Sequence, residues 1–488
     1  MKKSTSATSV VWSILRLATL LNSFVIFKIL SMKLSLLEYG TYSQVMMVVQ
    51  IATSVTLLGL NDSMNFFYNN RAIEENQKRQ YIGGIFLLEI TAGLVLAGLL
   101  AGAQGLIAGY FQNPALTEGH YILMASLIPM LDNLLTIYQM LYVSAQDSRT
   151  AAIGGFTLAL LKTLAVILAV VIFDSMAVIF LSMAGIMLCH VVFYWIRFRR
   201  RYGGFRFCAS RQILGAILKF GVPMGIYQLT NMLYIECDKL VIGRLVGSEM
   251  LAVYANCSRL LPYNILITAF ATILAPVITN IVSEKRNREA ARLVRLYLKL
   301  GYMSVWLLTT VTLIHSRQMI SILYDDKYLV GQTIFILYIL NSMVQFAVMH
   351  LVIIASGDTK FLMRASLCTL VLGLLLNVVM FYAIGNNGPA AATVLVSVLY
   401  TVLVLRKTAR LLEISVGSLF DFSHMFLYLG QLAVTGAVFF FLKQLLLGWG
   451  VPMLVTTLVT GGSYCLCNLL LRKRELKGLF HSIDDLAR

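Results

Sequence analysis

The chain has 488 residues, of which 59% are apolar and only 12% are charged, and its mean hydropathy is +0.81. This composition excludes an ordinary soluble domain and indicates a protein that crosses a membrane many times. The formal net charge of +17 would suggest a nucleic-acid partner, but the basic residues lie in alternate loops between apolar stretches, so no nucleic-acid binding is expected.

The apolar stretches follow one another along the whole chain. A helix that crosses the hydrocarbon core needs about 20 apolar residues. Fourteen stretches approach or exceed this length, and we predict spans at residues 9–31, 41–60, 82–109, 119–145, 152–173, 176–196, 214–236, 250–278, 298–315, 330–355, 363–383, 388–405, 424–444 and 450–471. The predicted fold is therefore an all-α polytopic membrane protein.

Positive charge collects at the chain start and in every second loop thereafter. Clusters precede the first span and follow the second, sixth, eighth, twelfth and last, among them Lys2, Lys3, Arg71, Lys78, Arg79, Arg197, Arg199, Arg200, Arg201, Arg286, Arg288, Arg406, Lys407, Arg472 and Lys473. By the positive-inside rule, both termini are predicted to be cytoplasmic.

The two halves of the chain resemble each other. A shift of 212 residues lays the segment 39–43 over 251–255 and the charged loop 71–79 over 283–291. Repeated halves are typical of transporters that move one lobe against the other. We predict an N-lobe at residues 1–206, a C-lobe of six spans at 207–412, and two further spans with a basic tail at 413–488.

Ionisable residues inside the predicted spans are candidate functional groups, because a charge at bilayer depth is costly unless it faces a cavity or a partner. Arg16 and Lys28 lie on the first span, and Arg259 lies on the eighth. Their cations could bind phosphate oxygens, or they could extend to the nearest interface. Lys162 and Asp132 both fall near mid-membrane, where they could form a functional pair or a structural salt bridge.

Two carboxylates and several amides complete the set of candidates. Glu89 could relay a proton. Asp238 has two possible roles: it could bind a coupling proton or cation, or it could lie with Glu236 in a solvated turn after the seventh span. Side chains that could hydrogen bond to a sugar, or could only join helices, are Gln44, Gln228, Asn231, Asn256 and Asn264. The seven Cys and the His residues show no metal-ligand spacing, so neither a metal nor a catalytic site is expected.

A series of short motifs carries a family resemblance across nearly the whole chain. In order they are Leu37-Glu38-Tyr39-Gly40-Thr41-Tyr42-Ser43, Gly59-Leu60-Asn61, Leu218-Lys219-Phe220-Gly221-Val222-Pro223, Asp238-Lys239-Leu240-Val241-Ile242-Gly243, Tyr254-Ala255, Pro276, Leu323-Tyr324-Asp325-Asp326-Lys327-Tyr328 and Ala355-Ser356-Gly357-Asp358-Thr359-Lys360. Their order resembles that of the polysaccharide flippases, of the O-antigen type, in the multidrug/oligosaccharidyl-lipid/polysaccharide (MOP) exporter superfamily.

The resemblance implies two six-helix lobes in a bacterial cytoplasmic (inner) membrane. It also implies export of a polyprenyl-diphosphate-linked oligosaccharide without enzymatic chemistry or a cofactor, coupled to Na+ or H+. The expected partners are this substrate, membrane lipids and polysaccharide assembly proteins. Fourteen spans also suit a flippase of peptidoglycan precursors, and a cation-coupled multidrug exporter of the same superfamily is a further alternative. A membrane polymerase would need a long external loop with catalytic side chains, which the sequence lacks.

Overall fold

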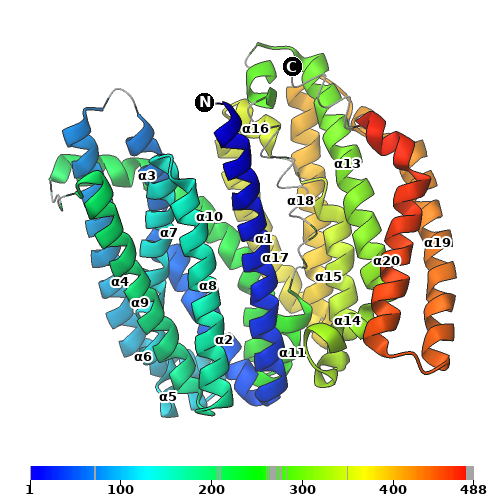
Figure 1. Ribbon diagram of the computed structural model, residues 1–488, viewed down its shortest axis with the longest axis horizontal. Helices are drawn as coiled ribbons and strands as arrows, with labels where there is room; N and C mark the ends of the chain where they lie inside the picture. Colours follow the sequence, from blue (N-terminus) through cyan, green and yellow to red (C-terminus); the bar gives the residue numbers. More distant parts are fainter. Residues whose placement is uncertain are drawn as a thin grey trace. The chain divides into compact units, whose positions relative to one another are not determined.

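The computed structural model describes residues 2–479, except 71–72, 206, 208–209, 260, 262, 264–270, 272–273, 275–276, 283 and 349. The side chains of residues 2–14, 16, 17, 20 and 359 also lie outside the description. The described residues form helices joined by short loops, with no strand among them (Figure 1). The all-α prediction is therefore confirmed.

Contacts divide the chain into two compact units, Met1–Val253 (unit 1) and Tyr254–Arg488 (unit 2). This division lies beyond residue 206, where the sequence placed the end of the N-lobe. The shift arises from α10 (Arg211–Leu245), which packs against α2, α3 and α4 of unit 1.

The helices of unit 1 match the predicted spans closely. They are α1 (Lys2–Lys33), α2 (Leu36–Leu57), α3 (Leu60–Asn69), α4 (Glu75–Phe111), α5 (Ala115–Glu118), α6 (Tyr121–Ala125), α7 (Ile128–Ser144), α8 (Ser148–Val171), α9 (Met176–Tyr202) and α10, and α11 (Ser248–Cys257) begins in this unit. α7 lies centrally in unit 1, because it packs against α2, α3, α4, α8 and α9, while α1 lies along α8 (Figure 1).

Local sequence explains where α2 begins and ends. The side chain of Ser35 accepts a hydrogen bond from the Glu38 amide, and the Glu38 carboxylate accepts one from the Ser35 amide, which forms a capping box. Leu58 and Gly59 then adopt left-handed backbone conformations that end α2 and start α3. The predicted span 41–60 is thus the larger part of a broken helix.

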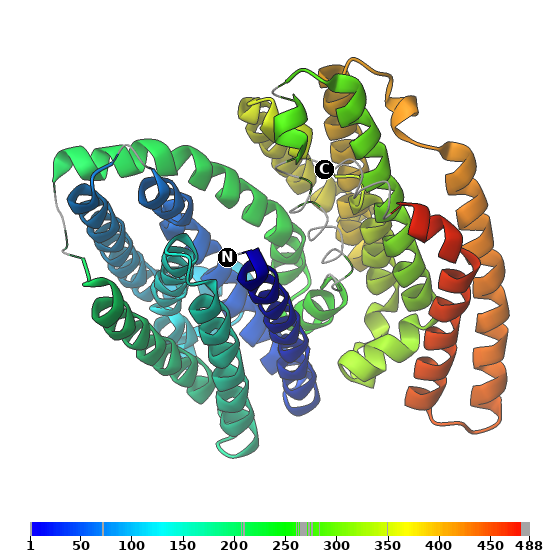
Figure 2. The same ribbon diagram turned by 45° about the horizontal axis from the view of Figure 1, so that its top comes forward.

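Unit 2 is built around α13. Its helices are α13 (Asn287–Ile314), α14 (Ser316–Leu323), η1 (Asp326–Gly331), α15 (Gln332–Gln345), α16 (Leu351–Ala355), α17 (Thr359–Ile384), η2 (Gly385–Asn387), α18 (Gly388–Leu411), η3 (Val416–Leu419), α19 (Phe422–Gly448) and α20 (Met453–Leu471). The buried face of α13 packs with Tyr428 and Leu432 of α19 and Tyr464 of α20. The last two helices are therefore an integral part of unit 2, as Figure 2 shows for α13, α19 and α20.

Eleven helical stretches of the described residues are long and apolar enough to cross a membrane. One of them, Lys360–Leu411, contains both α17 and α18 and so corresponds to two predicted spans. α1 matches the first predicted span in its backbone. The eighth predicted span, 250–278, lies largely outside the described residues beyond α11. The fold is that of a multi-pass membrane protein.

Candidate functional site

The polar side chains at membrane depth in unit 1 gather around α7. This helix carries Asp132 and Asn133 at consecutive positions, and two neighbours on a helix point about 100° apart. Asp132 therefore faces α8, while Asn133 faces α2 and α4. We call the group formed by Thr56, Glu89, Asp132, Asn133 and Lys162 the α7 polar cluster.

Asp132 and Lys162 form an ion pair between α7 and α8. The distance between Lys162 Nζ and Asp132 Oδ1 is 3.7 Å, and the two side chains are 20% (Lys162) and 47% (Asp132) exposed. A separation of this size is longer than a direct charged hydrogen bond, so the pair is loose. The next residue, Thr163, accepts a 2.7 Å hydrogen bond from Asn22 of α1. The sequence placed both charges near mid-membrane, and the structure brings them together.

Glu89 is a carboxylate with few partners. Its side chain is fully buried, and its Oε1 atom accepts a 3.0 Å hydrogen bond from Asn133 Nδ2. The same amide also donates to Thr56 Oγ1 and to the carbonyl of Thr53. Among the described residues, Glu89 Oε2 has no hydrogen-bond partner and no cation pairs with the carboxylate. An unpaired charge is costly to bury, so protonation relieves that cost and makes Glu89 a candidate proton site.

Gln44 joins helices within unit 1. Its side chain is fully buried, its Nε2 donates to Ser248 Oγ at 3.0 Å, and its Oε1 accepts from Asn113 Nδ2 at 2.7 Å. Both ends of the amide are thus used to connect α2 with α11 and with Asn113, the second residue after α4. The prediction of a sugar contact at Gln44 is not supported by this placement.

Gln228 and Asn231 occupy the middle of α10. Gln228 Nε2 donates a 2.8 Å hydrogen bond to Asp62 Oδ2 of α3, and Asn231 is exposed. Asp62 is not among the residues predicted from the sequence, because it follows directly after the apolar residues of the second predicted span. Its place after Gly59-Leu60-Asn61 could have indicated that the helix continues beyond the glycine.

Asp238 and Glu236 are buried rather than solvated. Asp238 is 1% exposed and its Oδ1 accepts a 2.7 Å hydrogen bond from the Lys239 amide. Glu236 is 5% exposed and pairs with Lys239 Nζ at 3.1 Å. The alternative of a solvated turn is therefore wrong, because α10 continues to Leu245 and places all three residues within the helix.

The four candidate cations do not form one described cluster. The side chain of Arg16 lies outside the described residues, and Lys28 is half-buried on α1. Arg259 belongs to unit 2, is half-buried, and lines a cavity of about 10 Å³ with Tyr338 of α15. Its neighbour Asn256 is fully buried, whereas Asn264 lies outside the described residues.

The fold and these buried ionic groups define a class. A two-unit helical membrane protein with ionisable side chains at bilayer depth has the construction of a secondary transporter. Among the described residues no group of three or more His, Cys, Asp or Glu could hold a metal ion.

Comparisons with known families agree with this class. The model of the family "Polysaccharide biosynthesis protein" matches residues 29–332, well over half of the chain, and that of "Lipid II flippase MurJ" matches residues 210–460. The chain belongs to the polysaccharide biosynthesis protein family, within the MOP exporter superfamily. No curated protein sequence matches it.

Solved structures support the fold. The lipid II flippase MurJ in an inward closed conformation is 14% identical with a TM-score of 0.72, covering 96% of this chain and 99% of that chain. An inward-facing multidrug resistance MATE family transporter is 12% identical with a TM-score of 0.69, covering 82% and 98%. A MOP superfamily transporter from Pyrococcus furiosus is 14% identical with a TM-score of 0.58, covering 85% and 97%.

Proposed function

We propose that the protein moves a polyprenyl-diphosphate-linked oligosaccharide, a repeat unit of a surface polysaccharide, from the cytoplasmic to the outer leaflet by alternating access. The observation that carries this proposal is the family match over residues 29–332. The fold supports transport in general, because MurJ and MATE structures share it. The choice of an anionic substrate rests on the cations that the chain places at membrane depth.

Arg16, Lys28, Lys162 and Arg259 are the proposed partners of the diphosphate. A phosphate gains strongly from cations in a site with little water, because charge-assisted hydrogen bonds are about twice as strong as neutral ones. Lys162 suits this role since its ion pair with Asp132 is loose at 3.7 Å. A diphosphate oxygen can therefore replace the Asp132 carboxylate as the partner of the ammonium group at low cost.

The candidate sugar-binding amides differ in how exposed their side chains are. Asn231 is exposed and Gln228 is half-buried, so both can offer an amide to a sugar hydroxyl. Asn256 is fully buried, and its role as a sugar contact would require movement of α11. Asn264 stays a proposal from the sequence, as does any contact with polysaccharide assembly proteins.

We assign the coupling ion to a proton at Glu89. Its carboxylate is fully buried beside Asn133, with one oxygen lacking a partner among the described residues. Asp132 has a counter-ion and Asp238 accepts a backbone hydrogen bond, so Glu89 is the carboxylate most suited to gain and lose a proton during transport. Coupling to Na+ through Asp132 or Asp238 is the alternative.

A second candidate substrate is a lipid-linked peptidoglycan precursor. The lipid II flippase model matches residues 210–460, and the MurJ structure aligns with 96% of the chain. Both substrates present a diphosphate and a polyprenyl tail, so the cation sites alone do not separate them. Restoring growth after depletion of a cell's own lipid II flippase would favour this second candidate.

An in-cell export assay tests the cation proposal. In a strain that depends on this protein for surface-glycan display, Arg259→Ala is expected to reduce display at least tenfold at equal membrane levels of the protein. Arg259→Lys should keep part of the activity. Arg199→Ala removes an exposed arginine that stacks on Trp195 and serves as the matched control. Normal display with Arg259→Ala would remove this residue from the proposal.

A further inference from the structure

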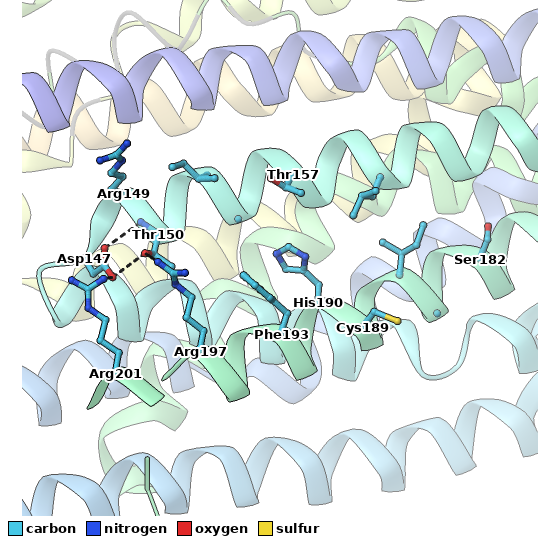
Figure 3. A pocket seen from close by; sticks show the side chains of 15 residues that line it. Asp147, Arg149, Thr150, Thr157, Ser182, Cys189, His190, Phe193, Arg197 and Arg201 are labelled. Carbon is cyan, nitrogen blue, oxygen red and sulfur yellow. Dashed lines mark hydrogen bonds and ion pairs between the residues drawn. The ribbon is translucent and has the colours of Figure 1, made fainter. Parts of the chain in front are cut away.

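A trough of about 1060 Å³ runs between α8 and α9 in unit 1 (Figure 3). It involves none of the residues assigned to the transported substrate. Its length along α8, from Arg149 to Leu161, is twelve residues or about 18 Å. This is close to half of the roughly 30 Å hydrocarbon core, that is, to the depth of one leaflet.

The walls of the trough are apolar and open. Ile153 and Leu161 of α8 are 44% and 40% exposed, and Phe193 of α9 is 47% exposed. A Cβ atom added at Gly185 would meet no atom within 4 Å, so the space beside this glycine is unfilled. Such a hollow suits a flexible hydrocarbon chain, because each buried CH₂ group contributes about 0.8 kcal/mol.

One end of the trough is basic. α8 begins and α9 ends there, so Arg149, Arg197 and Arg201 all line this end. Figure 3 shows Arg201 beside Asp147, whereas Arg149 extends from the start of α8 away from it. Arg201 pairs with Asp147 at 2.8 Å, and Arg197 Nη2 donates to Thr150 Oγ1 at 3.2 Å. Arg149 is exposed and has no hydrogen bond or ion pair with any described residue. Three guanidinium groups against one carboxylate leave two positive charges for an anionic headgroup.

A buried polar group lies further along the trough. His190 is only 7% exposed, and its Nε2 atom has no hydrogen-bond partner among the described residues. It lies seven residues, about 10 Å, along α9 from Arg197. Figure 3 shows its ring beside Phe193 on the side of α9 that faces α8.

We propose that the α8–α9 trough binds an anionic phospholipid of the leaflet that borders its basic end. The phosphate meets Arg149 and Arg197 at the basic end, and one acyl chain lies along Ile153 and Leu161. The trough is about one leaflet deep, which fits an acyl chain and is too short for the longer polyprenyl tail of the proposed substrate. The basic rim favours an anionic headgroup over a zwitterionic one.

Native mass spectrometry of the purified full-length protein tests this site. With equal amounts of phosphatidylglycerol and phosphatidylcholine, we expect about a tenfold preference for phosphatidylglycerol in the unaltered protein. Arg197→Ala and Arg149→Ala should each lose most of this preference, and Arg197→Lys should keep it. Gly185→Phe should reduce retention of both lipids because it fills the trough.

Two matched controls keep the experiment specific. Gly98→Phe adds the same ring to α4 at another glycine with open space around it, and Arg199→Ala removes a nearby arginine that does not line the trough. Both are expected to retain lipid as the unaltered protein does. Unchanged phosphatidylglycerol retention in a monodisperse Gly185→Phe protein, or equal retention of the two lipids by the unaltered protein, would overturn the proposal. Displacement of phosphatidylglycerol by an equal amount of polyprenyl monophosphate would assign the trough to the substrate tail instead.

Discussion

The Asp132–Lys162 pair shows how unit 1 accommodates charge at membrane depth. Each charge alone would be costly to remove from water, and the partner offsets part of that cost. The offset is incomplete because the atoms are 3.7 Å apart and Asp132 is 47% exposed. Removing one partner therefore leaves an unpaired charge whose cost is reduced, but not abolished, by the exposure.

We predict that Asp132→Asn and Lys162→Gln each lower the free energy of unfolding by about 1–2 kcal/mol, after allowance for this exposure. The double variant should lose clearly less than the sum of the two, because it leaves no unpaired charge. Denaturant unfolding of the purified protein measures all three changes. Strictly additive losses would show that the two side chains do not interact.

Glu475 follows the last membrane-spanning helix of unit 2 and is the centre of an ionic cluster. Lys299 Nζ and His424 Nε2 each lie 2.5 Å from its Oε1, and Arg472 Nη1 lies 3.1 Å from its Oε2. Burial raises the pKa of Glu475, but the hydrogen bonds from Lys299 and His424 outweigh it and lower the pKa to about 2. The cluster thereby connects α13, α19 and the residues after α20.

The lowered pKa sets the pH range in which Glu475 stabilises the protein. Its ordinary pKa is 4.5, so its contribution is complete above pH 4.5 and is lost as the pH falls toward 2. We predict that Glu475→Gln lowers the melting temperature at pH 6, and that the difference from the unaltered protein shrinks steadily below pH 4.5. A difference that grows on acidification would contradict the assigned pKa direction.

At the scale of helices, two glycines determine how α10 packs in unit 1. A Cβ atom at Gly225 would collide with the backbone of Leu58, and one at Gly221 would meet Leu58 O and Ser63 Oγ at 2.9 Å. Glycines four residues apart allow helices in a membrane to approach closely. The left-handed turn at Leu58 and Gly59 therefore fits against this face of α10.

We predict that Gly225→Ala destabilises the protein by about 1–3 kcal/mol, because the methyl group forces α10 away from α2. Gly215→Ala is the matched control on the same helix, since a Cβ atom there meets no atom within 4 Å. It should be neutral or slightly stabilising, as alanine favours helices. Thermal unfolding in detergent measures both variants, and equal effects would refute the packing argument.

Hydropathy predicted most of the helices but not their breaks. The spans 152–173 and 424–444 correspond to α8 and α19, whereas 41–60 is continued after a break by α3 and 330–355 is divided between α15 and α16. An average over about 20 residues reports how apolar a stretch is. It does not report a local left-handed residue such as Gly59, which ends a helix without changing the average.

The sequence indicated which polar side chains lie within the apolar helices, but not which partners they have. Asp132 and Lys162 were placed near mid-membrane and do meet, yet the partners of Glu89 and Gln228, namely Asn133 and Asp62, were not foreseen. Sequence position gives the height of a side chain along a helix. Which neighbouring helix it faces depends on how the helices pack, and that information is spread over the whole chain.

For the whole molecule, the family match indicates the class of protein, whereas the proposed substrate depends on a few side chains. The same architecture occurs in the MATE and MurJ structures, at only 12% and 14% identity. Helix packing alone therefore does not identify the substrate. The proposal of an anionic substrate rests on the cations Arg16, Lys28, Lys162 and Arg259 together with the family match.

Transport by the purified protein in proteoliposomes tests this conclusion most directly. A polyprenyl-diphosphate oligosaccharide is placed in both leaflets, and a glycosidase added outside cleaves only the outer pool. We predict complete cleavage with the unaltered protein, and cleavage of only about half with Arg16→Ala/Arg259→Ala, as in protein-free vesicles. The account would be contradicted if cleavage stopped at half with the unaltered protein, while the same vesicles showed that this protein moves a cationic drug.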